Sequence, residues 1–562
     1  MRASHLTSAM CGGLLLALGC SAQGSDGGGD APTGQAGTSS TPPPGSAGGP
    51  STAELGRDAV AARCETSQLA PPQLRRLTAR ELERTLRAVF PTLPATWSVR
   101  LGADPVSPLG FSNDARTLMV ASQTAQELLG TAEDVADALV QGGLASLAAC
   151  AADAGAGQAC AEQLAQSVGA KLFRRPLSAA EVSEYGALGA SIASKSDFTT
   201  GARWLLVSLI QSPNAVYRSE LGSAGHLDGY ELASELSYTF SGGPPSTELL
   251  ESAQRGELAT GPARVAVAKQ LLATPGGREQ LHQFLAEWSG YGRVASKTKT
   301  TVADFETLRT SMQEETKRFL EEAVVTRQGG VRELLTANYT FVDANLSRLY
   351  GFGSATGAEF VLAQRPTGQG LGLLAQGSIL AGSAHADSSS PTLRGLVLYE
   401  RLMCHQKPTP IAMIPTLEAP APGAKTTRER YEISHGGKGG CSACHRYFDP
   451  LGFGFEHFDE AGRYRSDEQG LAIDASGRAL SYPDGELAFT FDGQEDLVTQ
   501  LANQPEVADC VSGLVAAYAF AGAGGRTCLA EDARAAFARG ESGLLDYFAQ
   551  LAASPSFVDR AP

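Results

Sequence analysis

Apolar residues recur at helical spacing along most of this chain. Thr78 and Glu81 have the spacing of a capping box, in which two side chains satisfy backbone amides at the start of a helix. Apolar residues then follow every three or four positions, which is the period of one helical face. This face comprises Leu82, Leu86, Val89 and Phe90, and Pro91 ends the helix.

Other segments predict helices in the same way. A second capping box, Ser178 to Glu181, opens a helix that carries Val182, Tyr185 and Leu188. Together these patterns indicate a mainly α fold with a multi-domain helical body. Further helices are predicted over 204–210, 230–240, 312–325, 338–350 and, with breaks, 497–557.

The pattern changes after about residue 352, where Gly, Ser, Thr and Pro become more frequent. Five prolines between 408 and 422 disfavour regular structure there. The pairs Asp484–Gly485 and Asp492–Gly493 are typical of turns. We therefore expect residues 441–491 to form a loop-rich region before the C-terminal helices.

The first twenty residues have the features of a lipoprotein signal peptide. Met1 and Arg2 give a positive end, an apolar stretch follows, and Ala17-Leu18-Gly19-Cys20 closes it. Lipidation of Cys20 would anchor the chain in a membrane; cleavage near Ala22 would leave no lipid. Residues 21–55, rich in Gly, Ser and Pro, would form a flexible tether. These features predict a lipid-anchored protein of the cell envelope, most simply in the outer membrane, facing the periplasm or the exterior.

Length, composition and charge restrict the class of protein further. The chain has 562 residues, 43% of them hydrophobic and 19% charged, with a net charge of −15. This length favours several domains, and the acidic charge argues against nucleic acid as a partner. We predict helical modules at 64–185 and 200–352, a loop-rich module at 365–467, and a helical module at 485–560.

Export would place the cysteines in an oxidising compartment, where free thiols rarely persist. Cysteines that lie close in the sequence are the simplest disulfide pairs. We therefore predict the disulfides Cys150–Cys160 and Cys510–Cys528. Cys64 and Cys404 are left without obvious partners and could pair with each other.

The motif Cys441-Ser442-Ala443-Cys444-His445 is the sharpest chemical signal. Two thiols at this spacing can add to the two vinyl groups of haem, and the following histidine can ligate the iron. The prediction is one covalent haem c held by Cys441, Cys444 and His445. Phe453 and Phe455 would form apolar walls of the haem pocket. Alternatives are a disulfide or redox dithiol, and a zinc ion bound by both cysteines, His445 and His435.

Motifs on either side of this site resemble a known family. Leu393-Arg394-Gly395 and Arg463-Tyr464-Arg465 are similar to the planctomycete-type cytochrome c domain of the third kind. Other stretches resemble domains of unknown function that accompany it in planctomycetes and myxobacteria. The resemblance implies a cytochrome c-like domain that binds haem and transfers electrons, and it implies no reaction for the flanking modules. The accompanying stretches are 74–78, 173–177, 211–213, 230–233 and 372–385.

One departure from the family concerns the sixth iron ligand. The family commonly has Met or Ile where this chain has Phe448, so one convenient ligand is missing. His435 and His385 are the first candidates to replace it. Met413, Met403, His405 and His457 follow, and the sixth position could also be open.

These observations predict an exported c-type cytochrome lipoprotein that transfers electrons to or from an unidentified redox partner. An open sixth position would instead suit a haem-dependent oxidase or peroxidase. The third hypothesis is a non-redox binding or structural protein. In this case Cys441 and Cys444 would bind zinc or form a disulfide.

Overall fold

The computed structural model describes residues 69, 71–153, 157–405, 424–436, 439–522 and 531–561. All of them belong to one compact unit, Gly56–Pro562. Helices dominate and every sheet has only two strands, which confirms the predicted mainly α class. The predicted signal peptide and tether, Cys64, Met413 and Cys528 lie outside the described residues. In the described ranges, no helix is both long and apolar enough to serve as a membrane span.

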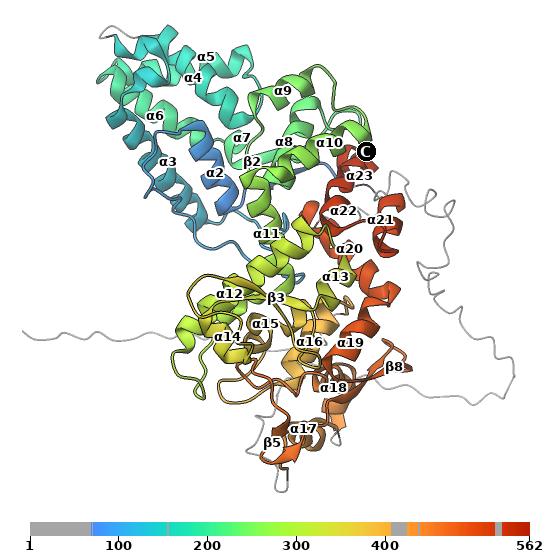
Figure 1. Cartoon of the computed structure of the whole chain (residues 1–562). Helices are drawn as coiled ribbons and strands as arrows, with labels where there is room; N and C mark the ends of the chain where they lie inside the picture. The colour runs from blue at the N-terminus through green and yellow to red at the C-terminus, as the bar shows by residue number, and fades with distance from the viewer. Residues whose placement is uncertain are drawn as a thin grey trace, which may run out of the picture. The chain divides into compact units, whose positions relative to one another are not determined.

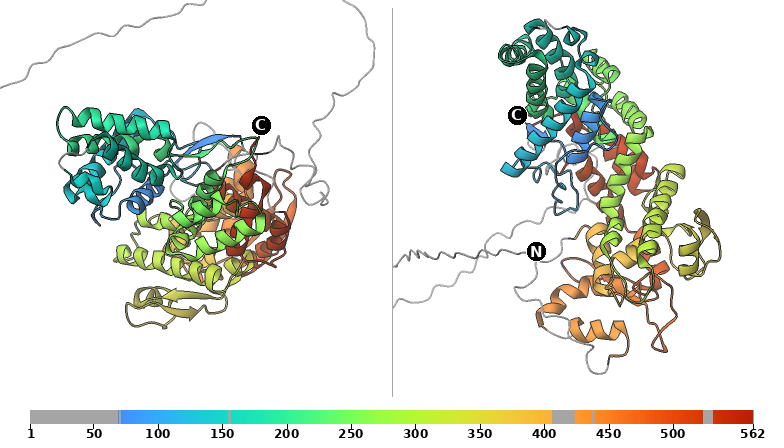
Figure 2. Two further views of the ribbon diagram at one scale, coloured as in Figure 1. Left: turned by 90° about the horizontal axis from the view of Figure 1, so that it is seen from above. Right: turned by 90° about the vertical axis from the view of Figure 1, so that its left-hand side faces the viewer.

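The N-terminal helices share one hydrophobic core, and several of them lie together in each view (Figures 1 and 2). Both predicted capping boxes are confirmed: Thr78 caps α2 (Ala79–Val89) and Ser178 caps α5 (Ala179–Ala193). Strand β1 (Gln73–Arg76) pairs antiparallel with β2 (Tyr217–Glu220). The other elements are α3 (Ser122–Gly142), η3 (Leu144–Ser146), η4 (Ala149–Ala152), α4 (Gln158–Phe173), α6 (Phe198–Gln211) and α7 (Pro213–Val216).

A second core begins with α8 (Gly229–Ser241), which ends at Gly242 in the left-handed conformation. This helix agrees with the prediction over 230–240. The prediction over 312–325 corresponds to the end of α12 (Phe305–Leu320) and its π-helical continuation η6 (Glu321–Thr326). The other helices here are α9 (Thr247–Gln254), α10 (Gly261–Ala273), α11 (Pro275–Ser289), η5 (Tyr291–Ser296) and α13 (Val331–Thr336).

The prediction of one helix over 338–350 is partly wrong. Its first half is strand β3 (Tyr339–Val342), which pairs with β4 (Val361–Gln364). The helix α14 (Ala344–Tyr350) starts only where the Asp343 side chain accepts a hydrogen bond from the Leu346 amide. Aromatic and β-branched residues in β3 favour a strand, and the Asp cap marks the boundary.

The cysteine motif lies on α18 (Gly439–Phe453), so the loop prediction is wrong for this segment. Helix α18 packs against α16 (Pro391–Arg401), and the two lie side by side (Figure 1). Glycines permit the close approach: a Cβ on Gly395 would lie 1.8 Å from the Phe448 carbonyl oxygen, and one on Gly452 1.9 Å from that of Pro391. The neighbouring elements are η7 (Leu373–Ala375), α15 (Gly377–Gly382), α17 (Thr427–Tyr431) and the π-helical turn η8 (Glu432–Gly436).

After α18 the chain forms two small hairpins and then helices, as the C-terminal pattern predicted. The hairpins are β5 (Asp467–Glu468) with β6 (Leu471–Ala472), and β7 (Ser476–Leu480) with β8 (Leu487–Asp492). The C-terminal helices pack in the second core together with α8 and α11. They are α19 (Gly493–Ala502), α20 (Pro505–Ala519), α21 (Glu531–Ala538), α22 (Leu544–Gln550), η9 (Leu551–Ala553) and α23 (Pro555–Val558).

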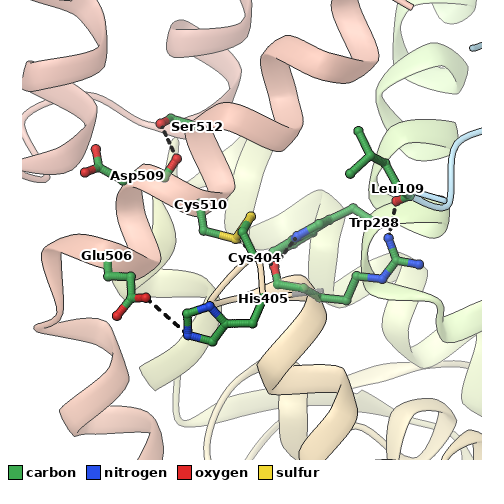
Figure 3. The surroundings of a disulfide bond; sticks show 9 residues. Leu109, Trp288, Cys404, His405, Glu506, Asp509, Cys510 and Ser512 are labelled. Carbon is green, nitrogen blue, oxygen red and sulfur yellow. Dashed lines mark hydrogen bonds and ion pairs between the residues drawn. A yellow bond between two sulfur atoms is a disulfide. The ribbon is translucent and has the colours of Figure 1, made fainter. Parts of the chain in front are cut away.

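Two disulfides are present among the described cysteines. The predicted Cys150–Cys160 bond is confirmed. Cys510 instead bonds to Cys404, 106 residues away, so its predicted pairing with Cys528 and the suggested pairing of Cys64 with Cys404 are both wrong. Figure 3 shows His405 and Glu506 beside this bond, 3.3 Å apart. The disulfide ties the segment after α16 to α20.

Candidate functional site

Helix α18 presents Cys441, Cys444 and His445 at positions i, i+3 and i+4. Side chains at this spacing lie on one face of a helix. Both cysteines are half-buried free thiols, whereas the disulfides form elsewhere. Cys444 packs against a small aromatic cluster made by Tyr399, Tyr447 and Phe448. The motif therefore offers two thiols and one imidazole on a single surface.

Asp449, one helical turn beyond His445, fixes the orientation of two imidazoles. Its carboxylate lies 3.0 Å from Nδ1 of His445 and 2.8 Å from Nδ1 of His435. It also accepts a hydrogen bond of 2.6 Å from the Thr392 hydroxyl. Burial opposes ionisation, but hydrogen bonds from His435 and His445 outweigh it, so the pKa of Asp449 lies below its usual value. The carboxylate is thus an anionic partner for both rings, and Nε2 is the ring nitrogen of His445 that Asp449 does not contact.

A cavity of about 450 Å³ lies beside these imidazoles. This volume falls within the range of small-molecule and cofactor pockets. Phe453, predicted as a pocket wall, lines it, with the Arg428 guanidinium 4.6 Å from its ring centre. The remaining lining residues are mostly polar; they include Tyr431, His435, Ser442, His445, Arg446, Asp449 and Arg478.

Phe455 is placed differently from its expected role. It is buried in the second core and is not among the residues that line the cavity. Phe458 is buried in the same core. The structure therefore brings only Phe453 of these phenylalanines to the cavity.

The two first candidates for a sixth ligand occupy different places. The His435 ring lies against His445, with 3.8 Å between ring centres. His385 does not join them: its Nε2 lies 3.3 Å from the hydroxyl of Tyr431, whose ring packs edge-on against His435. Burial lowers the pKa of His385 below its usual value.

The other candidates have their own surroundings. Met403 is buried in the second core, and His405 packs on Tyr399. Nδ1 of His457 lies 3.0 Å from the Arg465 carbonyl oxygen, and its ring stacks on Tyr464. None of these three is among the residues that line the cavity.

Within the described residues, one group could hold a metal ion, and it comprises His435, His445 and Asp449. Their ligand atoms all lie within 4.8 Å of one another. Cys441 and Cys444 do not belong to this group. The structure therefore does not assemble the zinc set of two cysteines and two histidines that the sequence allowed.

Comparison with family models identifies four regions of the chain. Residues 75–141 match PSD3, a protein of unknown function (DUF1587), and 160–220 match PSD5, a protein of unknown function (DUF1595). Residues 227–352 match PSD4, a protein of unknown function (DUF1592). Residues 371–468 match PSCyt3, a protein of unknown function (DUF1588).

The chain carries the planctomycete cytochrome c-type domain families. This confirms the predicted resemblance, and it places the cysteine motif inside the PSCyt3 region. A search of curated proteins and a search of solved structures find no match.

The family motifs of the PSCyt3 region have structural roles around the site. Arg394 is buried and donates hydrogen bonds of 3.0 Å and 2.7 Å to the carbonyl oxygens of Phe455 and Phe458. Burial lowers the pKa of Arg394 to about 10. Arg465 donates a hydrogen bond of 3.1 Å to the carboxylate of buried Glu456. Burial raises the pKa of Glu456 above its usual value. These two arginines fix the chain that leaves α18.

Asp449 is the site residue that the sequence argument did not single out. It stands four residues after His445, which is the spacing of side-chain partners on a helix. Predicting a helix over 439–453 would have revealed this pairing. The sequence did not predict this helix, because the segment contains Gly and Pro and its apolar residues follow no clear helical period. Packing against α16 stabilises the helix.

Proposed function

We propose that this protein is an exported c-type cytochrome that binds one haem covalently and transfers electrons. The observation that carries the proposal is the arrangement on α18. Two free thiols share one helix face with a histidine whose Nδ1 is held by a buried carboxylate. Thioether attachment needs free thiols, and ligation of the iron needs an oriented histidine.

The described residues fit such a group. Cys441 and Cys444 would hold it through sulfur, and His445 would ligate iron through Nε2. Asp449 would keep the His445 ring in one tautomer and raise its basicity as a ligand. Phe453 would contact the apolar part of the haem, and the arginines that line the cavity could pair with the carboxylates of the haem. Bound there, haem would supply a one-electron iron couple.

His435 in its observed position does not suit the opposite face of the iron. Two imidazoles that held one iron from opposite sides would have the iron between their rings. Ring centres 3.8 Å apart leave too little room for that arrangement. His435 would have to move away from His445 to become the sixth ligand; as placed, it supports Asp449 instead.

A haem-dependent oxidase or peroxidase is the second candidate. The cavity beside His445 favours it, because about 450 Å³ lined by polar groups could admit a small substrate. An open sixth position would give a high-spin ferric spectrum that shifts on addition of cyanide. A low-spin spectrum at rest that does not respond to cyanide would exclude this candidate.

Export and lipid anchoring are part of the proposal. The signal-like segment ending in Cys20 supports them, and disulfides in the folded part suit an oxidising compartment. Radiolabelled palmitate should enter the wild-type chain in a bacterial host and should not enter Cys20→Ser. Equal labelling of both chains would contradict the anchor.

A pyridine haemochrome spectrum tests the haem directly. The chain, produced with a cytochrome c maturation system, should show a c-type band with one haem per chain. Cys441→Ser with Cys444→Ser should abolish the band, and Ser442→Ala, inside the same motif, should retain it. A colourless wild-type protein would overturn the proposal.

A further inference from the structure

We propose that His435, His445 and Asp449 form a binding site for a divalent transition-metal ion in the chain made without attached haem. The three side chains come from two elements, η8 and α18, and meet at one edge of the cavity. The ligand set excludes both cysteines, so it differs from the proposed haem attachment.

The distances suit ligands of a single ion. Two ligands of one ion, with bonds of about 2.1 Å, lie about 3 Å apart at right angles and about 3.4 Å apart at the tetrahedral angle. The Asp449 Oδ2 atom lies 2.8 Å from Nδ1 of His435 and 3.0 Å from Nδ1 of His445. The carboxylate oxygen therefore already lies at the distance of an adjacent ligand from each imidazole nitrogen, and the ligand atoms of all three residues lie within 4.8 Å of one another.

The surroundings also resemble those of a metal site. A ligating carboxylate is usually held by a second hydrogen bond, and Thr392 donates one to Asp449 Oδ1 at 2.6 Å. Asp449 is buried at 4% exposure, whereas both imidazoles are partly exposed and line the cavity. The cavity leaves room for water or a small anion at the remaining coordination positions.

The donor types select the class of ion. Two imidazoles and one carboxylate suit zinc, cobalt, nickel or ferrous iron, whereas calcium and magnesium prefer oxygen ligands alone. His445 also belongs to the proposed haem attachment. We therefore expect the ion in chains that have not received haem, and not in the loaded cytochrome.

The experiment uses the full chain produced without the maturation system and freed of metal by a chelator. Titration with Zn²⁺, followed by calorimetry, should show one ion bound per chain. His435→Gln and Asp449→Asn should each weaken binding by at least about tenfold. The matched control is His226→Gln, because His226 contacts Asp559 at 2.6 Å as an exposed His–Asp pair outside the site. This variant should bind Zn²⁺ like the wild type.

Titration with Co²⁺ identifies the donors and keeps the proposal testable if a variant misfolds. Nitrogen and oxygen ligands should give weak visible bands without the intense charge-transfer band of a cobalt thiolate. Cys441→Ser with Cys444→Ser should leave the spectrum unchanged. No saturable binding, binding that survives both site substitutions, or a thiolate band would each overturn the inference. The haemochrome result is independent, because it concerns chains made with the maturation system.

Discussion

At the scale of single residues, Asp449 is the side chain that connects the three elements of the site. One carboxylate contacts His435 on η8, His445 on α18 and Thr392 on α16. Cys441, Cys444 and His445 could be predicted from the sequence as candidate haem-holding residues, because their spacing is a chemical motif. The sequence did not predict Asp449, because the role of this residue depends on a helix that tertiary packing stabilises.

Asp449→Asn should raise the reduction potential of the haem-loaded protein. In the proposed cytochrome, the Asp449 carboxylate would increase electron donation from His445 and so stabilise ferric iron. A neutral amide removes this stabilisation, so ferrous iron becomes relatively more favourable. A spectroscopic redox titration of the visible bands measures the midpoint.

Glu432→Gln is the control for this change. Glu432 lines the same cavity, and its substitution removes the same charge as Asp449→Asn. Its carboxylate pairs with Arg428 at 2.9 Å and not with His445. Its midpoint should rise less than that of Asp449→Asn. Equal shifts would mean that charge alone acts, and an unchanged midpoint in Asp449→Asn would contradict the role of the hydrogen bond.

The close packing of α16 on α18 is the feature that matters most at the scale of elements. Gly395→Ala would place a methyl group 1.8 Å from the Phe448 carbonyl oxygen, so the helices must separate. We expect a loss of about 3 kcal/mol in the free energy of unfolding, as for overpacked cores. Urea denaturation measures it.

The comparison variant for this prediction is Gly513→Ala. Gly513 lies inside α20, and a Cβ there meets no atom within 4 Å. Alanine should stabilise that helix by about 0.5 to 1 kcal/mol. If Gly395→Ala proved as harmless as Gly513→Ala, the two helices would not pack as described.

The N-terminus of α5 gives a prediction of pH dependence. The Arg175 hydrogen bond, together with hydrogen bonds from Ser178, lowers the pKa of Glu181 to about 2, below a usual value near 4.3. A lowered folded-state pKa contributes stability above the unfolded value, and this stability is lost as the pH falls toward 2. Glu181→Gln should therefore cost about 1 kcal/mol at pH 7.

Thermal unfolding of both proteins between pH 7 and pH 3 checks this expectation. The difference in melting temperature should be constant near neutrality and should shrink below about pH 4. A difference that is independent of pH would show that the Glu181 charge contributes nothing to the helix terminus.

At the scale of the whole molecule, periodicity and capping boxes predicted most of the helical body. The sequence failed where long-range contacts decide the outcome. Strand β3 depends on its partner β4, about twenty residues further along. Likewise, Cys510 has a nearer cysteine in sequence, Cys528, but the fold brings Cys404 to it.

The Cys404–Cys510 bond should contribute strongly to stability because it closes a long loop. The loop-entropy relation gives about 5 kcal/mol for a separation of 106 residues and about 3 kcal/mol for the separation of 10 in Cys150–Cys160. Replacing both cysteines of each pair by serine, followed by urea unfolding, compares them. A smaller loss for Cys404 and Cys510 would contradict this ranking.

The proposed cytochrome requires a covalent group at Cys441 and Cys444. Mass spectrometry of the peptide that contains residues 441–445, taken from matured protein, tests it most directly. We predict that this peptide carries the mass of one haem and that neither of its thiols reacts with an alkylating reagent. An unmodified peptide whose two cysteines both alkylate would contradict the central claim.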